Sequence, residues 1–191
     1  MQKGDHLSTL LRSDKSVFTI KDIALLWQEA DTSTSRVRLN YYVKKGSLYH
    51  LRRGLYAKSK EYNQLELATR IFTPSYISFE TVLTKEGLIF QYQKTITMAS
   101  YLTREINIKN QLYSFKKIKD SVLINNAGVV NEGQTSVATK ERAFLDTLYL
   151  NSNYHFDNLR SIDWDKIHDL QPIYNNQRMT KVVNKLFKDN L

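Results

Sequence analysis

The chain contains no cysteine, only two prolines and only six glycines among its 191 residues. The lack of cysteine excludes a disulfide framework and a thiolate zinc site, and it makes a reducing cytoplasm the simplest compartment. The glycines occur singly, so neither a GxxxxGK[ST] nor a GxGxxG phosphate loop is present. No run of eighteen uncharged apolar residues occurs, and the first residues lack the apolar core of a signal peptide. The sequence therefore predicts a cytoplasmic protein without a membrane span.

Acidic side chains are missing from residues 32–60, which hold eight cations and no carboxylate. Residues 1–60 contain twelve Lys and Arg against five Asp and Glu, a net of +7, whereas residues 61–191 contain sixteen against fourteen, a net of +2. A helix face that is merely solvated usually interleaves both signs. The concentration of positive charge in one segment therefore indicates a polyanionic partner.

The apolar spacing of the first sixty residues predicts three helices and a hairpin. The first helix spans residues 6–11, and the second starts at Thr19, where Asp22 completes the pattern of a capping box. The third spans residues 36–45 and ends at Gly46, which suits a left-handed cap. Alternating residues 48–57 then predict a hairpin with Arg52 and Arg53 at its tip. This order is typical of a winged helix-turn-helix domain, assigned to residues 1–60.

The remainder of the chain, residues 61–191, has a mixed pattern that follows a polar linker over residues 58–63. The sequence predicts helices at residues 64–72, 78–86, 139–150, 163–170 and 176–188. It predicts short strands at residues 96–99, 105–108, 112–118 and 122–124, with a turn at 125–128. The expected fold class is α+β: an N-terminal winged helix-turn-helix domain followed by a mixed α/β C-terminal domain.

The third helix is the expected DNA reader, with a core stripe that includes Leu39 and Tyr42. Arg38 is the strongest candidate for a forked bond to guanine, and Asn40 suits adenine. Thr34 and Val37 suit thymine methyl groups, while the terminal lysines and the hairpin tip suit phosphates or the minor groove. The predicted DNA-binding residues are Ser33, Thr34, Arg36, Arg38, Asn40, Tyr41, Lys44, Lys45, Arg52 and Arg53.

Evidence for an enzyme is weak, because the four histidines lie in unrelated segments without an HExxH pattern. Arg142 and Asp146 are one helical turn apart and are expected to form an ordinary ion pair. A metal-dependent nuclease would need clustered carboxylates, and Glu80, Glu141 and Asp146 are the only candidates that neighbouring helices could supply. We therefore expect no catalytic site, metal or cofactor, and keep a nucleic-acid-processing enzyme as an alternative.

Three stretches together resemble one family: KKGSLYHLRRGLYAK at residues 44–58, SYISFETVL at 75–83 and TSVATKERAFLDTLYL at 135–150. The chain is similar in this order, over nearly its full length, to the AbiEi antitoxins of type IV toxin-antitoxin systems. The resemblance implies a winged helix that binds operator DNA at inverted repeats and represses its own operon. It also implies a C-terminal domain, over residues 61–191, that counteracts a nucleotidyltransferase-like toxin, usually in abortive phage infection.

The resemblance assigns the DNA-binding role to residues 36–45 and to the hairpin tip. It assigns an antitoxin surface, by the polar members of the C-terminal phrases, to Ser78, Glu80, Lys140, Glu141, Arg142 and Asp146. Self-association on the DNA and direct contact with the toxin stay open. The alternative is a stand-alone winged-helix regulator whose second domain senses a ligand or dimerises.

Overall fold

The computed structural model describes residues 5–29 and 32–190 and has a mixed α+β architecture. It divides into two compact units, Met1–Ile71 and Phe72–Leu191. The division falls eleven residues after the boundary expected at residue 60. Among the described residues, no helix is both long and apolar enough to cross a membrane.

The first unit combines helices with a small antiparallel sheet. Its elements are α1 (Asp5–Arg12), β1 (Val17–Thr19), α2 (Ile20–Leu26), α3 (Thr32–Lys44), β2 (Tyr49–Arg52), β3 (Leu55–Ala57) and α4 (Gln64–Ile71). The hairpin β2–β3 is confirmed, and its sheet has the order β1-β3-β2. Strand β1 was not predicted, because three residues are too few for alternation to be visible.

The start of α2 is fixed by the predicted capping box, which is confirmed. The Thr19 hydroxyl accepts a hydrogen bond from the backbone N–H of Asp22, and the Asp22 carboxylate accepts one from the backbone N–H of Thr19 at 2.8 Å. Two of the unpaired N–H groups at the helix start are satisfied in this way. Lys15 also donates to Asp22, at 2.6 Å. These bonds fix the direction in which α2 leaves the sheet.

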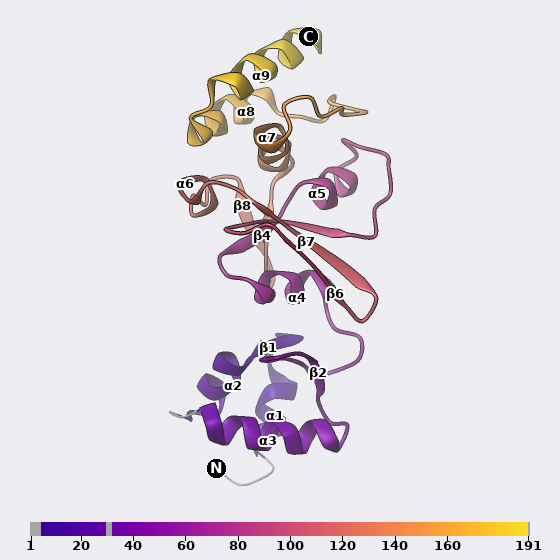
Figure 1. The fold of residues 1–191 in the computed structure, drawn as a ribbon, viewed down its shortest axis with the longest axis vertical. Helices are drawn as coiled ribbons and strands as arrows, with labels where there is room; N and C mark the ends of the chain where they lie inside the picture. The colour runs from indigo at the N-terminus through magenta and orange to yellow at the C-terminus, as the bar shows by residue number, and fades with distance from the viewer. Residues whose placement is uncertain (1–4, 30–31, 191) are drawn as a thin grey trace. The chain divides into compact units, whose positions relative to one another are not determined.

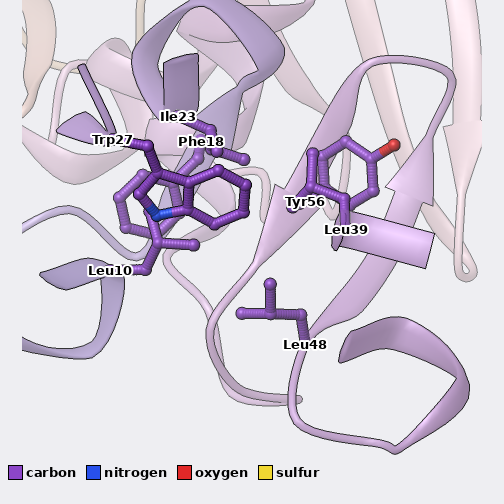
Figure 2. Packing of buried hydrophobic residues seen from close by; sticks show 7 residues of the cluster. All are labelled: Leu10, Phe18, Ile23, Trp27, Leu39, Leu48 and Tyr56. Carbon is purple, nitrogen blue, oxygen red and sulfur yellow. The ribbon is translucent and has the colours of Figure 1, made fainter. Parts of the chain in front are cut away.

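A single apolar cluster holds the helices of the first unit against its sheet (Figure 2). Its buried members are Leu10, Phe18, Ile23, Trp27, Leu39, Leu48 and Tyr56. The Trp27 indole nitrogen donates to the backbone oxygen of His6 at 2.8 Å, so the polar end of this large side chain is satisfied as well. Each of α1, α2 and α3 therefore contributes to one core.

Helix α3 begins at Thr32, four residues before the predicted start, so Ser33 and Thr34 lie in its first turn. Ser35 is completely buried, and its hydroxyl donates to the Glu29 carboxylate. The expected left-handed cap after α3 is confirmed, since Gly46 has φ of 72° and its N–H donates to the carbonyl of Val43.

Helix α4 packs with the first unit rather than opening the second. The Glu66 carboxylate, on a residue that is 2 % exposed, accepts hydrogen bonds from the Ser16 backbone N–H at 2.9 Å and from the Ser16 hydroxyl at 2.6 Å. Arg70 donates to Asp22 at 3.3 Å. These bonds join α4 to β1 and α2, which explains why the boundary follows Ile71.

We therefore expect a fragment of residues 1–71 to be more stable than a fragment of residues 1–60. The loss of charged hydrogen bonds to a buried partner costs about 1–3 kcal/mol. Urea denaturation followed by circular dichroism measures this difference, with Glu66→Gln in the longer fragment as a variant that keeps the helix but weakens its bonds to Ser16. Equal midpoints for the two fragments would show that α4 contributes nothing to the first unit.

The second unit is built on a six-stranded mixed sheet. Its elements are β4 (Ser75–Ile77), α5 (Glu80–Lys85), β5 (Ile96–Ser100), β6 (Arg104–Ile108), β7 (Gln111–Lys117), α6 (Asp120–Leu123), β8 (Val129–Glu132), β9 (Thr135–Ala138), α7 (Lys140–Leu150), α8 (Trp164–Leu170), the 3₁₀ turn η1 (Gln171–Tyr174) and α9 (Gln177–Asp189). The strand order is β6-β7-β5-β4-β9-β8, in which β4–β9 and β5–β7 are parallel pairs.

Helix α7 is the central helix of this unit, and Figure 1 shows it between the sheet and the pair α8–α9. All eight residues from 141 to 148 are buried. The apolar residues Phe144 and Leu145 are both completely buried. Because α7 is covered on every side, its polar residues are buried too.

The helices predicted around residues 139–150, 163–170 and 176–188 are confirmed within two residues at each end. The strand predicted at residues 122–124 is wrong, because Asp120–Leu123 forms the short helix α6. Strand β4 and the hairpin β8–β9 were not predicted. Their few apolar residues alternate over only three or four positions, which is too short a stretch to distinguish strand from loop.

Candidate nucleic-acid interface

The exposed face of α3 carries side chains suited to the edges of base pairs. Ser33, Thr34 and Asn40 are exposed, and Val37 and Tyr41 are 72 % and 53 % exposed although both are largely apolar. In a DNA major groove, exposed apolar side chains match thymine methyl groups, and side-chain donors match the polar edges of the bases. The predicted residues 33, 34, 40 and 41 are therefore brought onto one solvent-facing surface.

A cavity of about 380 Å³ lies between α3 and the hairpin β2–β3. Its polar lining comes from Arg36 and Asn40 of α3, His50 of β2 and Arg53 at the hairpin tip. None of the described residues that line it is acidic. The side chains of Arg36, Asn40 and Arg53 have no hydrogen-bond or ion-pair partner within the described part of the chain. The cavity thus presents several unused donors to one anionic or hydrogen-bond-accepting ligand.

Tyr56, which is 7 % exposed, also lines this cavity, which we call the α3–hairpin groove. Burial raises the pKa of the Tyr56 hydroxyl, and the positive charge of Arg36 opposes the shift only in part. The hydroxyl is therefore a neutral donor at physiological pH. Neither His50 nor Tyr56 was predicted as a site residue, although their places on the strands that follow α3 were known from the alternating pattern.

Arg38, the strongest predicted base reader, is half-buried, with 40 % of its side chain exposed. Its guanidinium forms an ion pair with the Glu29 carboxylate and lies 3.0 Å from Nε2 of His6. Glu29 also accepts the hydrogen bond from Ser35, so this side of α3 is joined to α1 and to the segment after α2. Arg38 is thus paired within the first unit, whereas Arg36 on the same helix is exposed and lines the cavity. The choice of Arg38 as the principal base reader stays a prediction.

The remaining predicted cations lie at the C-terminal end of α3 and on the hairpin. Lys44 and Lys45 are exposed, and the Lys45 ammonium lies 4.9 Å from the centre of the Tyr41 ring. The interaction with Tyr41 raises the pKa of Lys45, which keeps the lysine charged. Arg53 is exposed at the turn, whereas Arg52 is half-buried at a register shift in the hairpin. The two arginines therefore have different surroundings, and Arg53 borders the groove.

The polar residues predicted as an antitoxin surface are mostly interior. Ser78, Arg142 and Asp146 are completely buried, and Glu141 is 3 % exposed. The prediction that these four form a surface is therefore wrong, because α7 is enclosed between the sheet and α8–α9, and Ser78, which follows β4, donates to Asp146 of that helix. Lys140 is half-buried at the start of α7, where its ammonium donates to the carbonyl oxygen of Ser161.

Arg142 and Asp146 form the expected ion pair, with Nε 3.3 Å from Oδ1. The carboxylate also accepts hydrogen bonds from Ser78 Oγ at 2.7 Å, Tyr174 OH at 2.7 Å and Tyr76 OH at 3.0 Å. Burial raises the pKa of Asp146, and Arg142 and the three hydroxyls oppose that shift. The carboxyl group of Asp146 is thus the acceptor at the centre of four surrounding side chains.

Arg142 also donates to the Tyr76 hydroxyl, from Nη2 at 3.0 Å, and to two backbone oxygens. Nη2 donates to the carbonyl of Val122 and Nη1 to that of Ala127, each at 2.7 Å. Gly128 follows Ala127 with φ of 73°, and a Cβ there would meet Cβ of Arg142 at 3.0 Å. The buried arginine thus holds α6 and the turn after it against α7. We call Arg142, Asp146 and the hydroxyls around them the buried arginine network.

Glu80, Glu141 and Asp146 do not converge on a metal. Glu80 pairs with Lys116 at 2.7 Å, whereas Asp146 pairs with Arg142. Across residues 5–29 and 32–190, no three His, Asp or Glu side chains lie together in a way that could hold an ion. No specific observation therefore favours the metal-dependent alternative.

Comparison with known proteins adds no assignment. No protein-family model matches the chain, and no curated protein matches it.

Proposed function

We propose that the first unit is a winged helix-turn-helix that binds double-stranded DNA, with α3 in the major groove and the hairpin β2–β3 as the wing. The observation that carries this proposal is the α3–hairpin groove, where Arg36, Asn40 and Arg53 have no partner and no acid lies in the lining. The order of three helices followed by a hairpin supports it.

Within this proposal the donors divide by position. Arg36 and Asn40 lie on α3, which enters the major groove of the DNA, so they meet the edges of the bases. Arg36 suits guanine and Asn40 suits adenine. Val37 lies on the same face and is 72 % exposed, which suits a thymine methyl group. Arg53 lies at the tip of the wing and meets the phosphate backbone or the minor groove. Sequence choice thus belongs to α3 and much of the affinity to the wing.

We further propose that the protein is an antitoxin of the AbiEi type, which represses its own operon and counteracts a nucleotidyltransferase-like toxin. The resemblance of the three phrases in residues 44–58, 75–83 and 135–150 supports this role. The concentration of positive charge in the first sixty residues supports a regulatory N-terminal part and a separate activity in the second unit. Since four of the six polar candidates are buried, that activity would use other residues of the second unit.

Selection from a random pool of duplex DNA by the full-length protein tests the DNA-binding proposal. We expect one sequence, arranged as an inverted repeat, to be enriched, and Arg36→Ala to abolish the enrichment. The antitoxin proposal is tested by co-expression with the adjacent reading frame, which should stop growth only when this protein is absent. An unenriched pool would refute the first proposal, and a harmless neighbouring gene would refute the second.

A further inference from the structure

A second cavity, of about 270 Å³, lies in the second unit at the start of α7. Helix α5, the hairpin β8–β9, the first turn of α7 and Lys166 of α8 line it. Its apolar lining includes Val82, Val130 and Val137, and six charged side chains line it as well. The cavity is therefore large enough for a small organic group and has both apolar and polar surfaces.

Glu141 lines this cavity and lacks a hydrogen-bond partner. It is the second residue of α7 and is 3 % exposed, and its Oε1 accepts no hydrogen bond within the described part of the chain. The nearest cation is the ammonium of Lys140, 4.0 Å from Oε1. A buried carboxylate oxygen without a donor destabilises the folded state, because it has lost its hydrogen bonds to water and forms no new one. The site thus has an unused acceptor.

The lysines around the cavity are already engaged. Their partners are Glu132 for Lys85 at 3.1 Å, Asp163 for Lys166 at 3.2 Å and the carbonyl oxygen of Ser161 for Lys140. The charged lining residues are three lysines and three glutamates, and Asp163 beside Lys166 brings the local charge to −1. The unpaired acceptor on Glu141, more than this small balance of charge, favours a cation.

We propose that this cavity binds a compact organic cation, an ammonium or guanidinium group on a short aliphatic chain. The cationic group donates to Glu141, where charge and hydrogen bond act together. The aliphatic chain lies on the wall of Val82, Val130 and Val137. The cation belongs either to a free small molecule or to a lysine or arginine side chain of a partner protein. The inference is independent of the DNA-binding proposal, since the cavity lies wholly in the second unit.

Titration of the full-length protein with butylguanidine, butylamine and butyrate tests the proposal by calorimetry. We expect both cations to bind and butyrate not to bind, and Glu141→Gln to weaken cation binding at least about tenfold because the charged acceptor is lost. Glu86→Gln makes the same change of charge at the mouth and should weaken binding by no more than about twofold, as a screened surface charge does. A blocked Gly-Arg-Gly peptide that binds more tightly than butylguanidine identifies a protein side chain as the source, and weaker binding identifies a small molecule.

Chemical-shift mapping on the unmodified protein gives a second readout that does not depend on a variant. We expect butylguanidine to shift the amide signals of β8, β9 and the first turn of α7, and to leave those of the first unit unchanged. The proposal is overturned if butyrate binds more tightly than either cation. It is overturned equally if Glu141→Gln and Glu86→Gln weaken binding alike, or if neither cation binds at about 10 mM.

Discussion

Replacement of Arg142 by methionine is expected to destabilise the second unit by about 3–5 kcal/mol. The change leaves the buried Asp146 carboxylate without its positive partner and removes the donors from the carbonyl oxygens of Val122 and Ala127. The loss is a large part of the stability of an ordinary domain, which is about 5–15 kcal/mol. Urea denaturation of the full-length protein, followed by a fluorescence probe in the second unit, measures the effect.

Two controls separate the charge from the packing. Asp146→Asn keeps the shape of the side chain but leaves Arg142 as an unpaired buried cation, so it should be destabilising as well. The double variant Arg142→Met/Asp146→Leu should lose less than the two single variants together, because no buried charge remains. The role given to the buried arginine network is contradicted if Arg142→Met has the same urea midpoint as the unchanged protein.

Arg36→Ala is expected to weaken binding to the selected DNA site by about 1–3 kcal/mol and binding to random duplex by much less. The guanidinium of Arg36 faces the α3–hairpin groove without a partner, which leaves its donors free for a base. Arg53→Ala should weaken binding to both duplexes alike. It should also make the slope of log K against log salt concentration less steep, by the amount that about one phosphate contact contributes. Fluorescence anisotropy with the two duplexes at several salt concentrations measures both effects.

Arg38→Gln is the matched control, because it removes one positive charge two residues away on the same helix. Its guanidinium is paired with Glu29, so we expect the ratio of specific to random binding to change less than with Arg36→Ala. A variant of Arg38 that lost more discrimination than the variant of Arg36 would restore Arg38 as the base reader. The orientation of α3 derived from the structure would then be wrong.

Local patterns predicted much of the first unit. The capping box of Thr19 and Asp22, the left-handed cap at Gly46 and the hairpin could all be predicted, since each depends on residues close in sequence. The stripe with Leu39 and Tyr42 was predicted as well, since Leu39 is completely buried and Tyr42 packs against the same cluster. The partners of Arg38 could not be predicted, because the polar Ser35 is completely buried and binds Glu29, which also pairs with Arg38.

In the second unit, the sequence predicted the long helices but not their surroundings. The ion pair between Arg142 and Asp146 follows from their spacing. Their complete burial depends on two distant tyrosines. Tyr76 is 66 residues from Arg142 in the sequence, and Tyr174 is 28 residues from Asp146. The wrong strand at residues 122–124 has the same origin, because a helical turn there aims the carbonyl oxygen of Val122 at Arg142. Contacts of this range have no local signal.

The dependence of DNA affinity on salt, measured with the full-length protein and duplex DNA, tests the central claim most directly. If α3 and the wing bind the duplex through the cations of the first unit, log K should fall linearly with log salt concentration, with a slope of about −0.9 for each phosphate contacted. Arg53→Ala should make that slope less steep. An affinity that does not change with salt, or no affinity for duplex DNA at low salt, would contradict the claim.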